Sequence, residues 1–351
     1  MDVGGVERAL LGLLSSFDPQ QVELHVGLLQ KKGDFLPLLP EGVAVHTCFQ
    51  GAWETVNRPP LATARELFRR GKRFEAFVRV CCYAVYKITG DHSLFYTYVL
   101  RHEPLLEETF DEAHAFAGPA SMLDFYICRK IRARKRYGWI HFDVRESSLN
   151  RVMTRRFFRC YEKVYVVSEE AKRHFDALFP RLAGRTEVRY HLLSADAIRA
   201  QAETGPTFDD GFRGKRILTV GRLSKEKGQE VTVEVLRRLL DRGCDVKWYY
   251  VGSGPMQARC EALAEACGVK ERTVFLGTQT NPYGYMRDCD VYVQPSRHEG
   301  YCITLAEARC FSVPIVATCF AGAEEQLAAR PQSLVTGMSA EALAGGIETF
   351  L

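Results

Sequence analysis

In the C-terminal part of the chain, short apolar runs alternate with longer segments in which apolar residues recur at helical spacing. The apolar runs are RILTVG (216–221), VKWYYVG (246–252), TVFLG (273–277), DVYVQP (290–295) and PIVAT (314–318). The segments between them predict helices around 229–242 and 255–267, then a short helix, then a helix that includes 305–308. Strands that alternate with helices predict an α/β fold with a parallel, doubly wound sheet, and near-continuous apolar strands fit burial on both faces.

The N-terminal part shows the same alternation less regularly. Its strand-like runs are VELHVGLL (22–29), VAVHTCF (43–49), DEAHAFAG (111–118), YGWIHFDV (137–144), KVYVVS (163–168) and EVRYHLL (187–193). Apolar residues at helical spacing predict helices over 4–16, 61–88 and 120–136.

The chain has 351 residues, which is enough for two domains. Residues 195–214 carry Gly, Pro, Asp and Thr without periodicity, which favours a connection between domains. We therefore expect an N-terminal domain over 1–195, a linker over 196–213 and a C-terminal domain over 214–351.

Composition narrows the class of protein. The chain is 46% hydrophobic and 26% charged, as is ordinary for a globular protein, and its net charge of +4 is too small to argue for nucleic acid. The twelve cysteines include the adjacent pair Cys81 and Cys82 but no C-x-x-C, and the N-terminus is not a signal sequence. We expect reduced thiols in a cytoplasmic protein, and no apolar run is long enough to span a bilayer.

Two basic segments leave alternatives open. In the first, helix 61–80, basic residues are interleaved with apolar ones: Arg65, Arg69, Arg70, Lys72 and Arg73 with Leu67, Phe68, Phe74, Phe77 and Val78. The second is the run RKIRARKR (129–136), which is expected to end the helix 120–136. Each segment is either a solvated face or a surface that holds the N-terminal domain against anionic lipid at the inner face of the cell membrane.

The stretch 289–308, CDVYVQPSRHEGYCITLAEA, carries the strongest candidate chemistry. A strand at 291–293 runs through a turn and a loop into a helix, whose free N–H groups and dipole would form an anion site. Gly300 would let the backbone approach a ligand closely. The carboxylates of Glu299 and Glu307 flank these amides and are better suited to hydroxyls than to an anion, so the ligand suggested is a nucleotide sugar.

Two further loops follow strands of the same predicted sheet. In VGRLSKEKG (220–228), Arg222 and Lys227 stand where a strand ends and a helix is about to begin. They would either hold phosphate oxygens or form a solvated basic turn. Gly252 and Gly254 close the next strand and are candidates to line a nucleobase pocket, although a lone G-x-G is a weak signal.

Glu299 and Glu307, with seven residues between them, resemble the E-x7-E motif of retaining glycosyltransferases with the GT-B fold, in particular family 4 and its bacterial polysaccharide enzymes. The neighbouring PS, EGY, LAEA and VPIVAT agree with this family, as do GRL-x-x-x-KG at 221–228 and WIH-x-D at 139–143. The resemblance implies two Rossmann-like domains that face a cleft. It also implies transfer of a sugar, with retention, from a UDP- or GDP-sugar to a glycan or lipid-linked acceptor, without a cofactor or nucleic acid.

The resemblance also implies roles for individual residues. Glu307 would bind the ribose hydroxyls and Glu299 the donor sugar, Arg222 and Lys227 would stabilise the diphosphate, and His141 would orient sugar or acceptor. Other donor-binding positions would be Gly4, Gly5, Gly252, Gly254, Gly300, Tyr301 and Cys302. We find no residue to name as a covalent nucleophile.

We expect transfer to need no divalent metal. Asp288 and Asp290 form a D-x-D, but they precede the strand 291–293 and so lie at the end away from the cleft. Arg222, Lys227 and the helix N-terminus would instead supply the positive charge that a leaving diphosphate requires.

The chain departs from the family pattern in several places. Cys302 stands where many relatives have Gly, His191 replaces an Asn, and Glu325 in AGAEEQL is only an approximate match to the usual GG-x-PE. The strand that should precede Gly4 and Gly5, and the last helix that crosses back to the first domain, are missing, as in a fragment. A non-catalytic nucleotide-sugar-binding subunit is the alternative function, and an epimerase or phosphorylase of the same fold is a weaker one.

Overall fold

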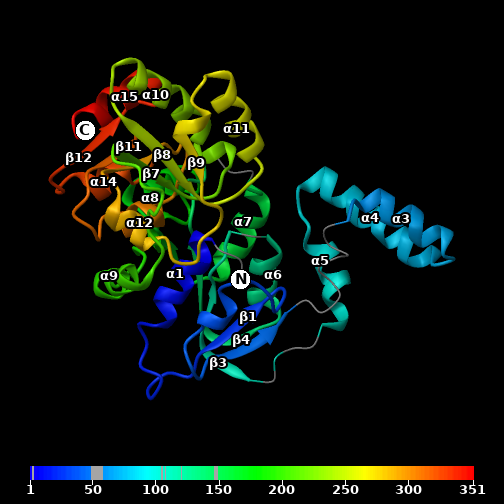
Figure 1. Ribbon diagram of the computed structural model, residues 1–351. Coiled ribbons are helices and arrows are strands. Elements are labelled where there is room, and N and C mark those ends of the chain that lie inside the picture. The colour runs from blue at the N-terminus through cyan, green and yellow to red at the C-terminus, as the bar shows by residue number, and fades with distance from the viewer. Residues whose placement is uncertain (2–3, 49–57, 104–105, 107, 120, 146–148) are drawn as a thin grey trace.

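The computed structural model describes residues 1, 4–48, 58–103, 106, 108–119, 121–145 and 149–351. Its C-terminal domain is built on a six-stranded parallel sheet in the order β12-β11-β10-β7-β8-β9 (Figure 1). The strands are β7 (Lys215–Val220), β8 (Val246–Val251), β9 (Thr273–Phe275), β10 (Val291–Gln294), β11 (Ile315–Thr318) and β12 (Ser333–Thr336). This confirms the predicted parallel α/β architecture.

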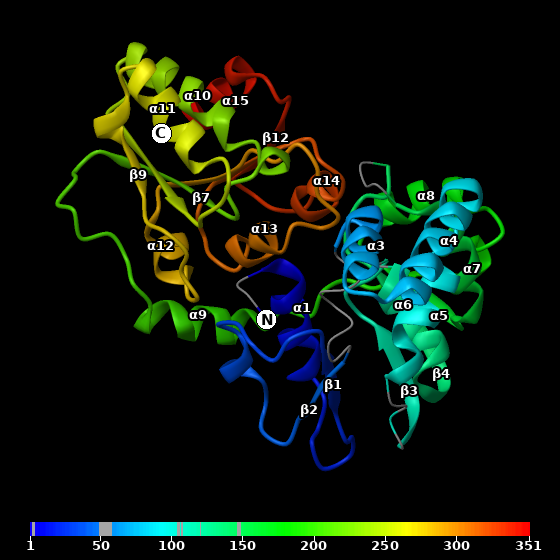
Figure 2. The same ribbon diagram turned by 90° about the vertical axis from the view of Figure 1, so that its right-hand side faces the viewer.

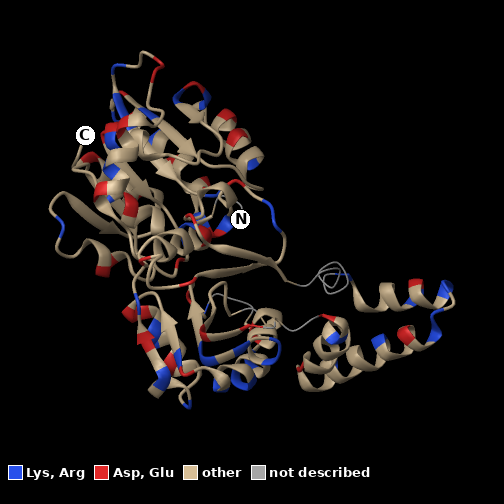
Figure 3. Ribbon diagram, turned by 90° about the horizontal axis from the view of Figure 1, so that it is seen from below, with Lys and Arg blue, Asp and Glu red and all other residues tan. Residues whose placement is uncertain are grey.

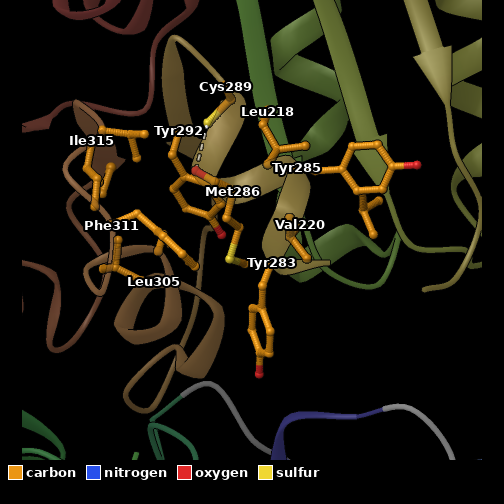
Figure 4. Close-up of a cluster of buried hydrophobic side chains, with 14 of the residues drawn as sticks. Leu218, Val220, Tyr283, Tyr285, Met286, Cys289, Tyr292, Leu305, Phe311 and Ile315 are labelled. Carbon is orange, nitrogen blue, oxygen red and sulfur yellow. Dashed lines mark hydrogen bonds between the residues drawn. The ribbon is translucent and has the colours of Figure 1, made fainter. Parts of the chain in front are cut away.

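Helices connect these strands and bury both faces of the sheet. They are α10 (Gln229–Asp241), α11 (Gln257–Ala266), α12 (Tyr283–Asp288), α13 (Ile303–Ala308), α14 (Ala323–Leu327) and α15 (Ala340–Glu348). Successive side chains of a strand point to opposite faces. Tyr292 therefore joins the cluster in Figure 4, with Leu218 and Leu305, whereas Val291 and Val293 join a second cluster on the other face.

The N-terminal domain holds a four-stranded parallel sheet of β3 (Thr109–Ala115), β4 (Arg132–Ile140), β5 (Lys163–Val166) and β6 (Thr186–Val188). The helices α6 (Ser121–Arg129), α7 (Arg151–Phe157) and α8 (Glu169–Leu178) accompany it. Ile140 and Val166 pack on the side of α6 and α8, whereas Trp139 and Tyr165 pack on α1 (Gly5–Leu14). The cluster around α1 also contains Ile303 of α13, so the apolar core continues from one domain into the other.

The two strands nearest the N-terminus do not join that sheet. β1 (His25–Leu28) and β2 (Ala44–Thr47) pair with each other in parallel as a separate two-stranded sheet. The His25 ring meets the Phe110 ring of β3 edge-on at 5.0 Å, which is one contact between the two sheets. The described residues ahead of α1 lie in no strand.

The predicted helix over 120–136 is wrong in its second half. α6 ends at Arg129, and the basic run continues into β4, which pairs with β3 over six register positions from Thr109↔Arg132 to Ala115↔Gly138. Within the run, Arg134 lies 3.2 Å from Asp111, and Arg136 donates to the Ile131 carbonyl at 2.8 Å. Pairing between strands outweighs the helical preference of these residues, because propensity is a weak prior against tertiary context.

The segment predicted to link the two domains, 196–213, contains most of a helix, α9 (Ala195–Thr204), although the sequence showed no periodicity there. Ser194 caps it by accepting from the Ala197 N–H, and Ile198 and Ala202 are buried in the same cluster as α12. These two residues are four apart and therefore lie on one helix face, a signal that the polar composition of the segment hides.

The cysteine prediction also needs one correction. Cys128 at the end of α6 and Cys160 after α7 form a disulfide, with their Cα atoms 6.3 Å apart. The remaining cysteines of the described residues are free. The two half-cystines are 32 residues apart in the sequence, so only the packing of α6 on α7 brings them together.

Three helices form an arm on the N-terminal domain. α3 (Pro60–Arg69) and α4 (Arg73–Thr89) make a hairpin that extends away from both sheets, and α5 (Ser93–Val99) packs against both α4 and α6 (Figures 1 and 2). Short 3-10 helices complete the structure at Leu36–Leu38, Leu100–His102, Phe158–Cys160, Ala183–Arg185, Lys225–Lys227 and Lys270–Arg272. No helix in the described ranges is long and apolar enough to cross a membrane.

Candidate functional site

The loops after β7 and β10 meet because these strands are parallel neighbours and their carboxyl ends share one edge of the sheet. Lys227, in the 3-10 turn after β7, places its Nζ 2.5 Å from Oε1 of Glu299 in the loop after β10. The buried Ser296 hydroxyl donates to the same oxygen at 2.7 Å. Burial alone would lower the pKa of Lys227, but the Glu299 carboxylate outweighs it and raises that pKa above its usual range, so the lysine is a fixed cation.

Arg222 belongs to the same loop but not to this ion pair. Its residue is exposed, and its carbonyl accepts a hydrogen bond from Gln229 Nε2 at 2.9 Å. Its guanidinium makes no hydrogen bond or ion pair with any residue that the structure describes. The structure thus brings together Lys227 and Glu299 and leaves Arg222 beside them, facing solvent.

The glycines after β8 are explained by contact with the Arg222 loop. A Cβ at Gly252 would lie 2.1 Å from the Gly221 oxygen, and one at Gly254 would lie 2.3 Å from the Leu223 oxygen. The Leu223 N–H donates to the Ser253 carbonyl at 3.0 Å, which ties the two loops together. The G-x-G therefore serves loop packing, and its predicted contact with a nucleobase stays a prediction.

Glu307 is fully buried on α13, and its two carboxylate oxygens differ in their hydrogen-bond partners. Oε1 accepts from the Tyr283 hydroxyl at 2.8 Å and lies 3.2 Å from Nη1 of Arg8, which comes from α1 of the other domain. Oε2 is buried without a hydrogen-bond partner in the described part of the chain. Burial raises the pKa of Glu307, and Arg8 and Tyr283 oppose that rise.

Sequence reasoning missed Arg8 and Tyr283. In Figure 4 the Tyr283 side chain points out of the buried cluster with its hydroxyl outermost, and Arg8 also donates to this hydroxyl. Arg8 and Tyr283 are separated by 275 residues in the sequence, and neither stands in a motif that resembles the family pattern. The packing of α1 and of α12 against α13 brings them to Glu307.

The start of α13 has an unusual backbone. Cys302, its N-cap, has φ 62° and ψ 83°, a left-handed conformation that favours glycine. This explains physically why glycine suits the position and why cysteine there is a departure. Gly4 and Gly5 begin α1 close by, since a Cβ at Gly5 would lie 3.6 Å from Cδ1 of Ile303.

Gly300 makes a close approach to the N-terminal domain. A Cβ there would lie 2.2 Å from the His141 carbonyl oxygen, and the predicted approach of the Gly300 backbone to a ligand stays a prediction. The Gly300 carbonyl also accepts from the buried Ser168 hydroxyl at 2.9 Å. Loop 298–301 is therefore part of the contact between the domains.

His141 follows β4 and lies against this loop. Its Nε2 is 2.6 Å from the Phe116 carbonyl, which can only accept, so Nε2 carries the proton and Nδ1 is left as an acceptor. Nδ1 is buried with no partner in the described residues. Burial lowers the pKa of His141 to about 4, and burial with the stacked His141 ring lowers that of His191 to about 3, so both imidazoles are neutral near pH 7.

Other contacts close the interface near Tyr301. Its ring lies 5.5 Å from the Tyr190 ring, and the Tyr190 hydroxyl donates to Glu325. Glu325 Oε2 also accepts from the Glu169 N–H at 3.2 Å, at the start of α8 in the N-terminal domain. These are contacts between the two domains.

The D-x-D lies at the opposite end of β10. Asp290 Oδ1 is 3.0 Å from Lys215 Nζ, and Asp288 accepts a hydrogen bond from the Arg287 guanidinium. Among the described residues, no group of three or more His, Cys, Asp or Glu side chains could hold a metal ion.

Comparison with solved structures identifies the fold. The crystal structure of Anabaena HepE in complex with UDP and glucose superposes with a TM-score of 0.67 at 19% identity, covering 99% of this chain and 86% of HepE. The crystal structure of TarM superposes with a TM-score of 0.55 at 15% identity, covering 74% of this chain and 51% of TarM. Both are GT-B glycosyltransferases, so the predicted GT-B fold is confirmed.

Sequence comparison finds glycosyltransferases over shorter segments. An uncharacterized glycosyltransferase of Methanocaldococcus jannaschii is 24% identical over 179 residues, which are 49% of this chain and 43% of the relative. The 4-alpha-N-acetylgalactosaminyltransferase of Campylobacter jejuni that acts on a diphospho-undecaprenol acceptor is 29% identical over 134 residues, 38% of this chain and 35% of the relative. The chain thus covers less than half the length of these relatives. Within its GT-B fold, residues 212–351 match the protein family Glycosyl transferases group 1.

Proposed function

We propose that this chain is a retaining glycosyltransferase that moves a sugar from a UDP- or GDP-sugar to a glycan or lipid-linked acceptor. The family match over 212–351, the transferase relatives and the structures of HepE with UDP and with UDP-glucose support a nucleotide-sugar donor. Nothing observed favours the non-catalytic subunit, since the named relatives are transferases.

The observation that carries the proposal is the unpartnered Oε2 of Glu307 on α13, the helix that follows the loop in which Glu299 pairs with Lys227. A buried carboxylate oxygen without a donor costs roughly 1–3 kcal/mol, which a ligand hydroxyl would recover. A ribose offers two adjacent hydroxyls, and the diphosphate attached to it would reach the cation of Lys227. A nucleotide sugar requires three sites, which are a carboxylate for the ribose, a cation for the diphosphate and a second carboxylate for the sugar.

In this proposal each residue keeps one task. Lys227 and Arg222 balance the charge that develops on the diphosphate as its bond to the sugar C1 breaks, together with the amides at the start of α13. Glu299 binds a hydroxyl of the donor sugar. His141 Nδ1, a neutral acceptor, holds a hydroxyl of the sugar or acceptor. The acceptor oxygen attacks C1 on the face that the phosphate leaves, and its proton passes to the departing phosphate oxygen.

The test is a donor panel followed by product analysis. UDP- and GDP-sugars are titrated into the purified protein by calorimetry, and the donor that binds is then incubated with glycan and lipid-linked acceptors. NMR of the product should show the same anomeric configuration as in the donor. Binding without turnover for any acceptor would favour the non-catalytic subunit, and an inverted product would contradict retention.

A lipid-linked acceptor would place the enzyme at the cytoplasmic face of a membrane, so we include a peripheral membrane contact through the N-terminal domain in the proposal. Within the run 129–136, Arg136 is engaged with backbone carbonyls, whereas Arg134 and its partner Asp111 are both exposed, so this run stays a second candidate for the contact.

A further inference from the structure

We infer that the α3–α4 hairpin docks on an anionic lipid surface through an apolar stripe on α4 and the basic residues beside it. This inference adds a membrane-docking surface to the proposed function. Only the biological role of the docking rests on the proposed function, because lipid binding is measured without donor or acceptor.

The stripe is an unbroken row of exposed apolar residues. Counted from Phe74, its members follow at intervals of three and four residues, which places them on one face of a helix. They are Phe74, Phe77, Cys81, Ala84 and Ile88. Phe74 is 74% exposed, Phe77 65% and Ile88 84%. The opposite face of α4 is the one that packs on its neighbours, where Ala76, Arg79 and Cys82 are buried.

Exposure of such a row in water is costly. Full burial of one side chain of this size contributes about 1.5–3 kcal/mol, and contiguous exposed apolar patches commonly mark binding surfaces. The hairpin extends away from both sheets in Figures 1 and 3, so an extended surface could meet the stripe without touching the rest of the domain.

The positive charge of the hairpin indicates which kind of surface it binds. Residues 58–90 contain eight basic and two acidic residues, a formal charge of +6, whereas the whole chain carries +4. Both acidic residues are already paired, Glu66 with Arg70 and Glu75 with Lys72. In the described chain no carboxylate lies within ion-pair distance of Arg65, Arg69, Arg73 or Lys87. Figure 3 shows Lys and Arg along the hairpin.

This charge argues for anionic lipid over a second copy of the chain. Two hairpins of +6 would repel each other across a shared apolar stripe, whereas anionic headgroups attract each basic residue and receive the aromatic rings at the level of the interface. Arg73 and Lys87 lie beside the stripe on the helical wheel, where they would reach headgroups while the Phe and Ile side chains enter the acyl boundary.

The experiment uses the full chain and vesicles of phosphatidylcholine with or without phosphatidylglycerol. We expect co-sedimentation with the anionic vesicles, weakened by salt. Phe74→Ser with Phe77→Ser, and separately Arg69→Glu with Arg73→Glu, should each reduce the partition coefficient at least tenfold, since one basic residue near the surface contributes about fivefold. Arg173→Glu with Arg259→Glu, two exposed arginines on other elements, makes the same charge change and should leave binding within about twofold.

Cys81 allows a direct test of insertion. It is exposed in the middle of the stripe, so an environment-sensitive fluorophore attached to it, in a Cys319→Ser background, should shift to the blue on anionic vesicles. Absence of binding at low salt, or binding without this shift, would overturn the inference. A dimer in analytical ultracentrifugation that Phe74→Ser with Phe77→Ser dissociates would also overturn it, in favour of pairing between copies.

Discussion

At the scale of single residues, the candidate site is defined by which charges already have partners. Lys227 and Glu299 neutralise each other at 2.5 Å, whereas Glu307 shares one oxygen with Arg8 and Tyr283 and has the other unpartnered in the described chain. A ligand that binds Lys227 or Glu299 therefore has to replace their ion pair. A ligand that donates to Glu307 Oε2 supplies the hydrogen bond that this oxygen lacks.

Glu307→Gln should weaken nucleotide binding. The amide keeps an acceptor for Tyr283 but replaces Oε2 with a donor, so a ribose hydroxyl can no longer donate there, and binding should lose roughly 1–3 kcal/mol. Calorimetry with UDP and GDP measures this loss. Equal affinity of the variant and the wild type for both nucleotides would exclude the ribose contact.

Lys227→Ala should lower the rate of transfer about 100-fold or more, because it removes a cation aimed at the leaving diphosphate. Lys225→Ala, an exposed lysine in the same 3-10 turn, is the matched control and should stay within about threefold. Rates are measured with the donor that the calorimetric panel identifies, in excess EDTA. Activity that EDTA abolishes and Mg²⁺ or Mn²⁺ restores would show that a metal does this work.

Acidification should destabilise the protein through His141 and His191. Their pKa values of about 4 and about 3 lie below the 6.5 of an ordinary histidine, so the unfolded chain binds protons that the folded chain does not. The contribution of these two histidines to the free energy of unfolding is complete above pH 6.5 and falls as the pH drops towards 4. The loss is up to ~1.4 kcal/mol for each unit by which folding lowers a histidine pKa. Urea midpoints at pH 7 and 4.5 should differ less for His191→Asn than for wild type.

At the scale of elements, periodicity predicted most strands of the C-terminal sheet, because strands buried on both faces are nearly continuous apolar runs. It failed where contacts with other elements determine the local structure. Residues 132–136 look helical and basic but pair with β3. In α9, Ile198 and Ala202 are the only apolar pair at helical spacing that indicates a buried face. The motif residues Lys227 and Glu299 were predictable from their place after parallel strands, whereas Arg8 and Tyr283 were not, because their contact depends on how two domains pack.

The start of α13 offers a test of backbone strain. At φ 62° a Cβ is unfavourable by roughly 1–2 kcal/mol, and glycine avoids this cost. Cys302→Gly and Cys302→Ala both remove the buried thiol, so the glycine variant should be the more stable by ~1 kcal/mol in urea unfolding. An alanine variant at least as stable as the glycine variant would show that this turn changes its conformation.

At the scale of the whole molecule, the two domains are held together by the loop 298–301, by α1 on α13 and by Glu325 at the start of α8. Gly300→Ala should force the domains apart, because its Cβ would lie 2.2 Å from the His141 oxygen. Small-angle scattering should show a larger radius of gyration. Gly345→Ala, where a Cβ would meet nothing within 4 Å, should leave it unchanged. An unchanged radius for Gly300→Ala would mean that the loop moves instead.

The bond from the Glu169 N–H to Glu325 has a consequence for motion. One of the free N–H groups that begin α8 is satisfied by a carboxylate from the opposite domain, and the nearby Ser168, which caps α8 within its own domain, is also tied to Gly300. Each separation of the domains therefore uncovers the first turn of α8. Hydrogen–deuterium exchange at the Glu169 amide would report how often the domains separate, and slower exchange with a nucleotide bound would show that the nucleotide holds them together.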